Sequence, residues 1–283
     1  MFKHLNNVRH NHKKQTLMKL KELDMFQKTL AKVGKSLLAV AVASTVATAA
    51  DARNDLPSHG ELRRALQTVV GAEVNGGAGL EFWAVIVDRD NVVRTVVFSG
   101  DDRSSQLPIG RVVTTAKATT VNALSLENFV VSNPQLSQPT LRNGLFQNLP
   151  DAFPVSDAGF RGPARLFGTR KDPMIGRIQG GATALGGGLA LFNDDGEVIG
   201  GLGIGGEVHP CADHNAAWIL RDMLGLDNLP PGIGFSETGD DNIVHDLDEN
   251  GVSASGFGTV ECSPEATAIS AALPTIYPIG PNY

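Results

Sequence analysis

The pattern of hydrophobic and polar positions predicts three helices and two pairs of strands. Ser58 and Glu61 form a capping box, in which each side chain satisfies a free backbone donor at the start of a helix. The apolar residues that follow repeat with helical spacing, at Leu62, Ala65, Leu66, Val69 and Val70. Runs rich in Val and Ile at 82–88 and 92–99, with a short turn between them, predict a hairpin.

A second helix begins near Pro108, which suits a first helical turn. Its predicted inner face consists of Ile109, Val112, Val113, Ala116, Ala123 and Leu124. A second strand pair is predicted at 184–192 and 197–204. A third helix over 212–224 has a predicted inner face of Ala216, Ile219, Leu220, Met223 and Leu224.

The segments between these elements lack a period. Residues 132–179 contain six prolines, and a loop of this length inside a domain is usually functional or an insertion. Two consecutive hairpins imply an antiparallel sheet that amphipathic helices must cover. We therefore expect an α+β sandwich over residues 51–226 with a loop insertion at 132–179, followed by a C-terminal extension at 227–283 that is tied to the domain.

The N-terminal region has the order of a secretory signal. Lys28, Lys32 and Lys35 precede an uncharged run at 36–50 that is rich in Ala, Val and Leu and ends in small residues. A membrane anchor needs about 20 apolar residues, so this run is too short for one. We expect a signal peptide at 25–50, cleavage near Ala50, and a periplasmic or secreted protein. Residues 1–24 are polar and are interpreted as an extension upstream of the native start.

The charge of the chain narrows the range of possible binding partners, and its cysteine content indicates a disulfide. Without residues 1–50 the chain keeps 15 basic and 28 acidic residues, a net charge of −13. Nucleic acid as a partner is unfavourable because phosphate binding needs a basic face, and anionic membrane surfaces are disfavoured for the same reason. Cys211 and Cys262 are the two cysteines, and in an oxidising compartment they are expected to form a disulfide. The alternative is a thiolate ligand or nucleophile at Cys211.

The glycine-rich stretch 186–206, an apolar strand, turn and return strand before a helix, resembles the second half of the GlcG/HbpS family. The strand at 84–88 and Ala116-Lys117-Ala118 resemble its first half, and Cys211-Ala-Asp-His-Asn-Ala-Ala-Trp218 resembles its secreted members. The resemblance covers about residues 56–262. It implies a profilin- or PAS-like sandwich, a homo-oligomer, and haem binding or haem handling as the function.

The densest group of candidate ligands is His209-x-Cys211-x-x-His214, between a strand end and a helix start. His214, Trp218 and Arg221 share one helix face, opposite the inward stripe. We predict that His209 and His214 bind haem iron or another metal, and that Trp218 and Arg221 contact the porphyrin. Alternatively, His209 and His214 have no ligand, and the chain's own loops or tail, or a partner subunit, cover Trp218.

Two further motifs have simpler explanations. The run at 201–206 matches G-x-G-x-x-G but does not open a helix directly, so small residues that let a strand pack closely explain it better than a dinucleotide site. Asp246, Asp248 and Asn250 match half of a calcium loop, and a polar hairpin turn explains the same residues.

Motifs for catalysis are absent: the sequence contains neither G-x-S-x-G nor H-E-x-x-H. Three functions therefore stay open. The first is an exported haem-binding or haem-handling protein. The second is an enzyme that acts on a small organic acid through Arg and His of the long loops. The third is a ligand-free accessory or structural oligomer. No apolar run after residue 50 predicts insertion into a membrane.

Overall fold

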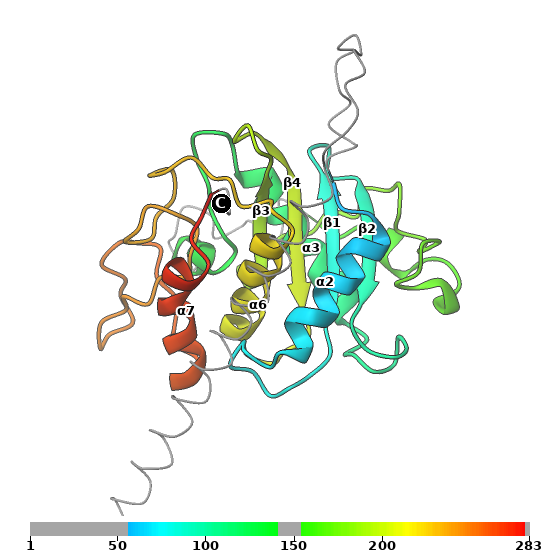
Figure 1. The fold of residues 1–283 in the computed structure, drawn as a ribbon, viewed down its shortest axis with the longest axis horizontal. Helices are drawn as coiled ribbons and strands as arrows, with labels where there is room; N and C mark the ends of the chain where they lie inside the picture. Colours follow the sequence, from blue (N-terminus) through cyan, green and yellow to red (C-terminus); the bar gives the residue numbers. More distant parts are fainter. Residues whose placement is uncertain (1–55, 141–153, 281–283) are drawn as a thin grey trace, which may run out of the picture. The chain divides into compact units, whose positions relative to one another are not determined.

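A computed structural model of the chain describes residues 56–140 and 154–280, so the predicted signal and upstream segments lie outside the described residues. The described part contains a four-stranded antiparallel sheet in the order β2-β1-β4-β3, with helices on both faces (Figure 1). This confirms the predicted α+β class. The main elements are α2 (His59–Gly71), β1 (Trp83–Asp88), β2 (Val93–Phe98), α3 (Gly110–Leu124), β3 (Gly188–Phe192), β4 (Val198–Gly205), α6 (Pro210–Met223) and α7 (Pro264–Ile276).

Helix α2 begins with the predicted capping box. The Ser58 N–H donates to Glu61 Oε2 at 2.9 Å, and the Glu61 N–H donates to Ser58 Oγ at 3.4 Å. Leu62, Leu66 and Val69 are fully buried, and the helix lies with α6 and α7 on one face of the sheet (Figure 1). In its described parts, the long loop forms only short helical turns, namely η2 (Pro134–Leu136), α4 (Ser137–Thr140), η3 (Asp157–Phe160) and η4 (Ala164–Leu166).

Both predicted hairpins form, and their pairing determines which loops meet. β1 joins the two hairpins, since Trp83 lies opposite Phe98 on β2 and opposite Gly205 on β4. Gly110, the first residue of α3, lies against the Trp83 ring and the Gly205 carbonyl. The start of β1, the end of β4 and the start of α3 therefore lie together at one edge of the sheet.

Helix α3 lies on the opposite face of the sheet from α2, α6 and α7 (Figure 1). Its predicted inner face was wrong, because Ile109 is 60% exposed and Ala123 is exposed, whereas Thr114 and Lys117 are buried. The helix is covered on a second side by the loop near Gln179, whose Nε2 donates to the Val112 carbonyl at 3.1 Å. Because both sides are covered, 11 of the 15 residues of α3 are buried and no simple apolar stripe marks its inner face.

The glycines of β4 let α3 approach the sheet at backbone distance. A Cβ atom on Gly201 would overlap the Ala118 carbonyl, and one on Gly203 would overlap the Thr114 carbonyl. The G-x-G-x-x-G run thus belongs to a strand rather than to the first turn of a helix. The prediction that its small residues serve close packing is confirmed.

Three buried ion pairs connect segments that are distant in sequence. Removing one partner of such a pair typically costs 3–5 kcal/mol, because the other charge is left buried and uncompensated. The pairs are Arg111 with Asp172, Lys117 with Asp213, and Arg221 with Asp241.

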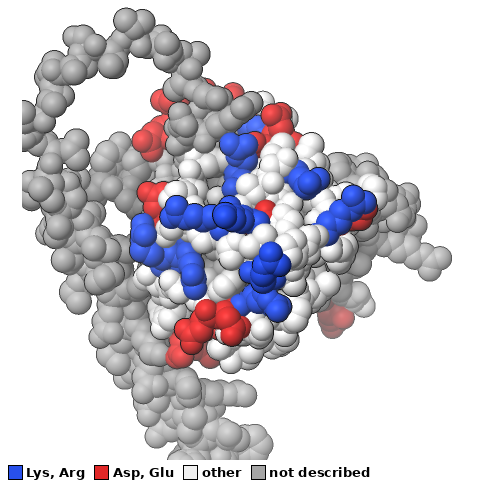
Figure 2. All heavy atoms as spheres, turned by 90° about the vertical axis from the view of Figure 1, so that its right-hand side faces the viewer, with Lys and Arg blue, Asp and Glu red and all other residues white. Residues whose placement is uncertain are grey.

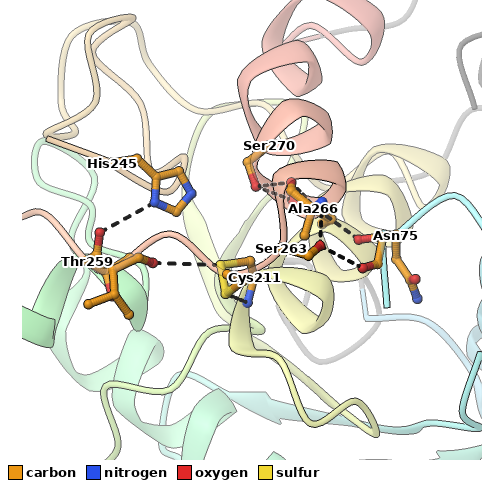
Figure 3. The surroundings of a disulfide bond; sticks show 11 residues. Asn75, Cys211, His245, Thr259, Ser263, Ala266 and Ser270 are labelled. Atoms are coloured by element: carbon orange, nitrogen blue, oxygen red, sulfur yellow. Dashed lines mark hydrogen bonds between the residues drawn. A yellow bond between two sulfur atoms is a disulfide. The ribbon is translucent and has the colours of Figure 1, made fainter. Parts of the chain in front are cut away.

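The C-terminal segment is tied to the sheet domain by the predicted disulfide. Cys211 and Cys262 are bonded, with their Cα atoms 6.1 Å apart (Figure 3), so the thiolate alternative is excluded in this structure. Beside the bond, Asn215 on α6 donates to the Ala266 carbonyl on α7 at 3.0 Å and accepts from Ser270 Oγ at 2.7 Å. Helix α7 is therefore fixed on α6 by both covalent and polar contacts.

The half-match to a calcium loop folds as a polar hairpin turn, as the simpler explanation predicted. Ser253 Oγ donates to Asp246 Oδ1 at 2.7 Å, and the Val252 N–H donates to Asp248 Oδ1 at 2.9 Å. These carboxylates therefore stabilise their own turn. Over the described ranges 56–140 and 154–280, every helix is too short or too polar to span a bilayer.

Asp227 is a buried acid whose carboxylate oxygens have no hydrogen-bond partner among the described residues. Burial raises the pKa of its carboxyl from 3.8 to about 7, although the Arg221 guanidinium acts in the opposite direction. The folded state therefore binds a proton here that the unfolded state has already lost at neutral pH. The contribution of the protonated Asp227 carboxyl to the free energy of unfolding is complete below about pH 4 and is lost as the pH rises through about 7.

We expect Asp227→Asn to be more stable than the wild type above about pH 8, by about 2 kcal/mol in the free energy of unfolding. A pKa shift of this size corresponds to about 4 kcal/mol, and the amide loses part of this because it too lacks hydrogen-bond partners. Urea denaturation of both proteins over a pH series measures the difference. The same pH dependence in both would show that Asp227 does not titrate in this range.

Candidate functional site

The structure separates the four residues predicted to bind haem. His209 is exposed at the N-cap of α6, whereas His214, Trp218 and Arg221 are at most 1% exposed. The ring of His214 lies beside the Ile243 N–H, with Nε2 3.1 Å from that nitrogen, and 3.2 Å from Asn242 Oδ1. Burial lowers the pKa of His214 to about 3, so this imidazole is neutral at physiological pH.

Trp218 and Arg221 share the face of α6 that the sequence predicted, but the chain's own C-terminal segment covers that face. Trp218 Nε1 donates to the Tyr277 carbonyl at 3.0 Å. Arg221 donates to both carboxylate oxygens of Asp241, at 2.7 and 2.8 Å. In the described structure these residues pack the C-terminal segment onto the sheet domain. This arrangement agrees with the alternative prediction in which the chain's own tail covers Trp218.

Metal binding by His209 and His214 has no geometric support in the described residues. Within 56–140 and 154–280, no group of three or more His, Cys, Asp or Glu side chains is arranged to hold a metal ion. Packing within the fold thus accounts for the burial of His214. Of the two predicted metal ligands, His209 is the one accessible to a ligand.

An open pocket lies at the edge of the sheet where β1 and α3 begin. Its volume is about 430 Å³, within the range of pockets that bind organic ligands. The polar lining consists of Arg103, Ser104 and Arg111. The apolar lining consists of Trp83, Pro108, Ile109, Val112, Phe160 and Phe167.

Local packing fixes the inner wall of the pocket. Trp83 Nε1 donates to the Leu107 carbonyl at 3.0 Å, and the Trp83 ring meets Phe98 edge to face, with centroids 5.5 Å apart. A Cβ atom on Gly110 would lie 2.6 Å from Trp83 Cδ1, so only glycine lets the first turn of α3 approach this ring. The indole is therefore held rigidly at the base of the pocket.

The opposite wall is positioned by Arg111. Its guanidinium forms a two-point ion pair with the Asp172 carboxylate and lies over the Phe167 ring, 3.8 Å from the centroid. It also donates to the Gly159 carbonyl. Asp172 accepts the N–H groups of Gly168 and Met174 as well. Arg111 thus holds the segment 159–174 in place rather than offering a free charge.

Among the described residues, the pocket mouth combines exposed apolar side chains with an exposed arginine. Ile109 is 60% exposed and Phe160 is 65% exposed, and Arg103 is exposed beside them. A ligand with a flat apolar body would stack on these side chains, and its acid group would pair with Arg103. Among the described residues that line the pocket, the side chains with polar groups are Arg103, Ser104, Arg111 and Trp83.

Sequence reasoning missed this pocket because its residues come from segments far apart in the chain. The available signal was the pair of aromatic residues Phe160 and Phe167 in a proline-rich loop that also carries several arginines. Aromatic residues in a loop without an apolar period indicate a contact, either with the protein core, as Phe167 makes, or with a ligand, for which Phe160 is exposed.

Searches of family models and of curated proteins each found no match. Among solved structures, the chain is similar to a PduOC:haem complex, with 19% identity, a TM-score of 0.40, and coverage of 64% of this chain and 95% of that chain. It is also similar to a double mutant of Streptomyces reticuli HbpS, at 17% identity and a TM-score of 0.39, covering 66% and 99%. The Klebsiella pneumoniae protein ORFY is similar at 12% identity and a TM-score of 0.37, covering 66% and 97%.

HbpS is one of the two proteins that give the GlcG/HbpS family its name. The structural neighbours thus include HbpS, a member of the family that the sequence resembles. The haem named for the PduOC structure is a property of that protein.

Proposed function

We propose that this protein binds a flat, apolar organic acid in the pocket at the start of α3, and that haem or a related porphyrin is the ligand. The observation that carries the proposal is the pocket itself, with aromatic walls, a protruding apolar mouth and an arginine at its edge. This combination suits a macrocycle that is apolar on its faces and carries carboxylates at its rim.

The pocket fits the organic part of haem better than it fits the iron. Ile109 and Phe160 offer exposed apolar surface to the ring, Trp83 and Phe167 line the pocket behind them, and Arg103 offers a partner for a propionate. Bound haem would supply an iron centre, but the described lining residues contain no His, Cys, Met or Tyr to ligate it. We infer that stacking and charge pairing hold the ligand, with Ile109 and Phe160 shielding it from water.

Binding is favoured over catalysis by the same lining. An enzyme acting on a small organic acid would need a group that moves a proton, and the described lining residues offer for this the Ser104 hydroxyl and two guanidinium groups. A ligand-free structural oligomer could cover the exposed Ile109 and Phe160 at a subunit contact, but it would leave the pocket behind them unfilled. Neither alternative uses the geometry as fully as ligand binding does.

Titration with haem and with iron-free protoporphyrin tests the proposal in one experiment. We expect both to bind with similar affinity, with a shifted Soret band, since the ring and its carboxylates make the contacts. His209→Ala should leave both affinities unchanged. Haem binding at least tenfold tighter than protoporphyrin, and weakened in His209→Ala, would instead assign iron ligation to His209. Failure of both to bind would remove the porphyrin proposal.

Export and self-association complete the proposal. The lysines before the apolar run at 36–50 and the disulfide, which suits an oxidising compartment, both support a periplasmic or secreted protein. N-terminal sequencing of the exported form should find a start between Ala50 and Arg53. We further propose, from the family resemblance, that the mature protein is a homo-oligomer, which sedimentation analysis would test.

A further inference from the structure

Positive charge is concentrated on one side of this acidic protein. The segment 161–177 carries five exposed cations, and its one acid, Asp172, is buried against Arg111. In contrast, the described residues 178–280 contain a single cation, Arg221, which is buried. Figure 2 shows Lys and Arg side chains across the centre of one face and most Asp and Glu side chains towards its edge. The net charge of the chain therefore conceals a basic face.

Helix α2 adds to this basic face. Arg64 Nη1 and Arg170 Nη2 lie 3.4 and 3.6 Å from the same point beside Gly60, so two guanidinium groups converge. Hydrogen bonds with Ser58 lower the pKa of the Glu61 carboxyl, and the nearby Arg64 cation adds to this lowering. We define the basic face by its exposed cations Arg64, Arg165, Arg170, Lys171 and Arg177.

The basic face adjoins the apolar mouth of the pocket. Phe167 lines the pocket and stands between Arg165 and Arg170 in the chain. Around the same mouth, Ile109 and Phe160 are 60% and 65% exposed. Protruding apolar side chains beside a row of arginines form a surface that is both cationic and partly apolar.

We propose that this basic face docks the protein on an anionic phospholipid surface, with the mouth of the pocket turned towards the lipid. Guanidinium groups bind phosphate with two parallel hydrogen bonds, and exposed apolar side chains enter the interfacial region of a bilayer. A soluble acidic protein would need a shaped surface to cover Ile109 and Phe160, whereas lipid adapts to them.

The negative net charge does not prevent this docking. Charges separated by more than a Debye length, about 8 Å at physiological ionic strength, are largely screened, so the local face determines the contact. The net charge thus disfavours an anionic membrane surface at long range, while this face would make the contact at short range. Docking goes beyond the proposed function. It rests on the proposed function only in that the purpose of docking would be to transfer a lipid-soluble acid between the membrane and the pocket.

Co-sedimentation of the mature protein with vesicles tests the docking. We expect binding to phosphatidylcholine vesicles that contain phosphatidylglycerol, none to phosphatidylcholine alone, and loss of binding at high salt. Neutralising Arg165→Gln, Arg170→Gln and Lys171→Gln together should reduce binding at least tenfold. The control changes the net charge by the same amount, −3, through three substitutions on exposed residues of the C-terminal segment, Ala254→Glu, Ala271→Glu and Thr275→Glu, and should bind nearly as the wild type does.

Each outcome decides the proposal. Equal loss in the control would mean that only net charge matters, and no binding by the wild type would remove the lipid surface altogether. If the wild type does not bind vesicles and the neutralised variant no longer self-associates, the basic face would instead be a contact between two copies of this chain. The neutralised variant should still bind protoporphyrin in solution, because none of its three residues lines the pocket. Failure of docking is thus separable from failure of the proposed function.

Discussion

Replacing Gly203 with alanine is expected to destabilise the protein by about 4 kcal/mol or more, enough to lower its melting temperature sharply. The added methyl group would overlap the Thr114 carbonyl and lie 2.9 Å from the Ala118 amide nitrogen. Both atoms belong to the backbone of α3, so no side chain can rotate away. The helix must move off the sheet, and this disrupts the packing of α3 against all the strands it contacts.

Gly71→Ala is the matched control for this substitution. Gly71 is the last residue of α2, and an added Cβ atom there has no atom within 4 Å and no left-handed backbone to strain. We expect it to be neutral or stabilising by about 0.5 kcal/mol, because alanine loses less conformational freedom on folding. Thermal denaturation followed by circular dichroism compares the variants. If the Gly203→Ala protein has the same melting temperature as the wild type, the close packing of α3 on β4 would be contradicted.

Removing the disulfide is expected to cost about 4 kcal/mol, because the bond closes a loop of 51 residues in the unfolded chain. The loss should appear first in the C-terminal segment. Trp218 reports on this segment, since its indole N–H donates to the Tyr277 carbonyl beyond α7. We therefore expect its fluorescence to shift to the red at lower urea concentrations in the Cys211→Ser/Cys262→Ser variant than in the wild type.

The double variant also provides the control for reductant. Reduction should shift the wild-type unfolding curve towards that of the variant and leave the variant's own curve unchanged. If full reduction leaves the wild-type curve where it was, the bond does not hold the C-terminal segment. If the curve moves in both proteins, the reductant acts elsewhere.

The predicted elements were those that short sequence patterns determine. The capping box of Ser58 and Glu61 fixes the start of α2 through two local hydrogen bonds. Each hairpin follows from two β-rich runs with a short polar turn. Predicting the pairing of Cys211 with Cys262 needed only the count of cysteines and the expectation of an oxidising compartment.

What the sequence did not reveal depends on contacts between distant segments. The inner face of α3 was misassigned because a second layer, the loop near Gln179, covers the helix from outside. Arg111 and Asp172 lie 61 residues apart, and no local period relates them. For Trp218, the shared helix face with His214 was predicted, but the C-terminal segment that covers it could not be placed from its own sequence.

The direct test of the central claim is the affinity for protoporphyrin of two variants with equally exposed substitutions. Ile109→Ser/Phe160→Ser removes the apolar mouth of the pocket. Val252→Ser/Val260→Ser removes two apolar side chains of similar exposure, 60% and 62%, that do not line it. We expect the first variant to bind protoporphyrin at least tenfold more weakly than the wild type, and the second to bind equally well. Equal affinity in all three proteins would contradict binding in this pocket.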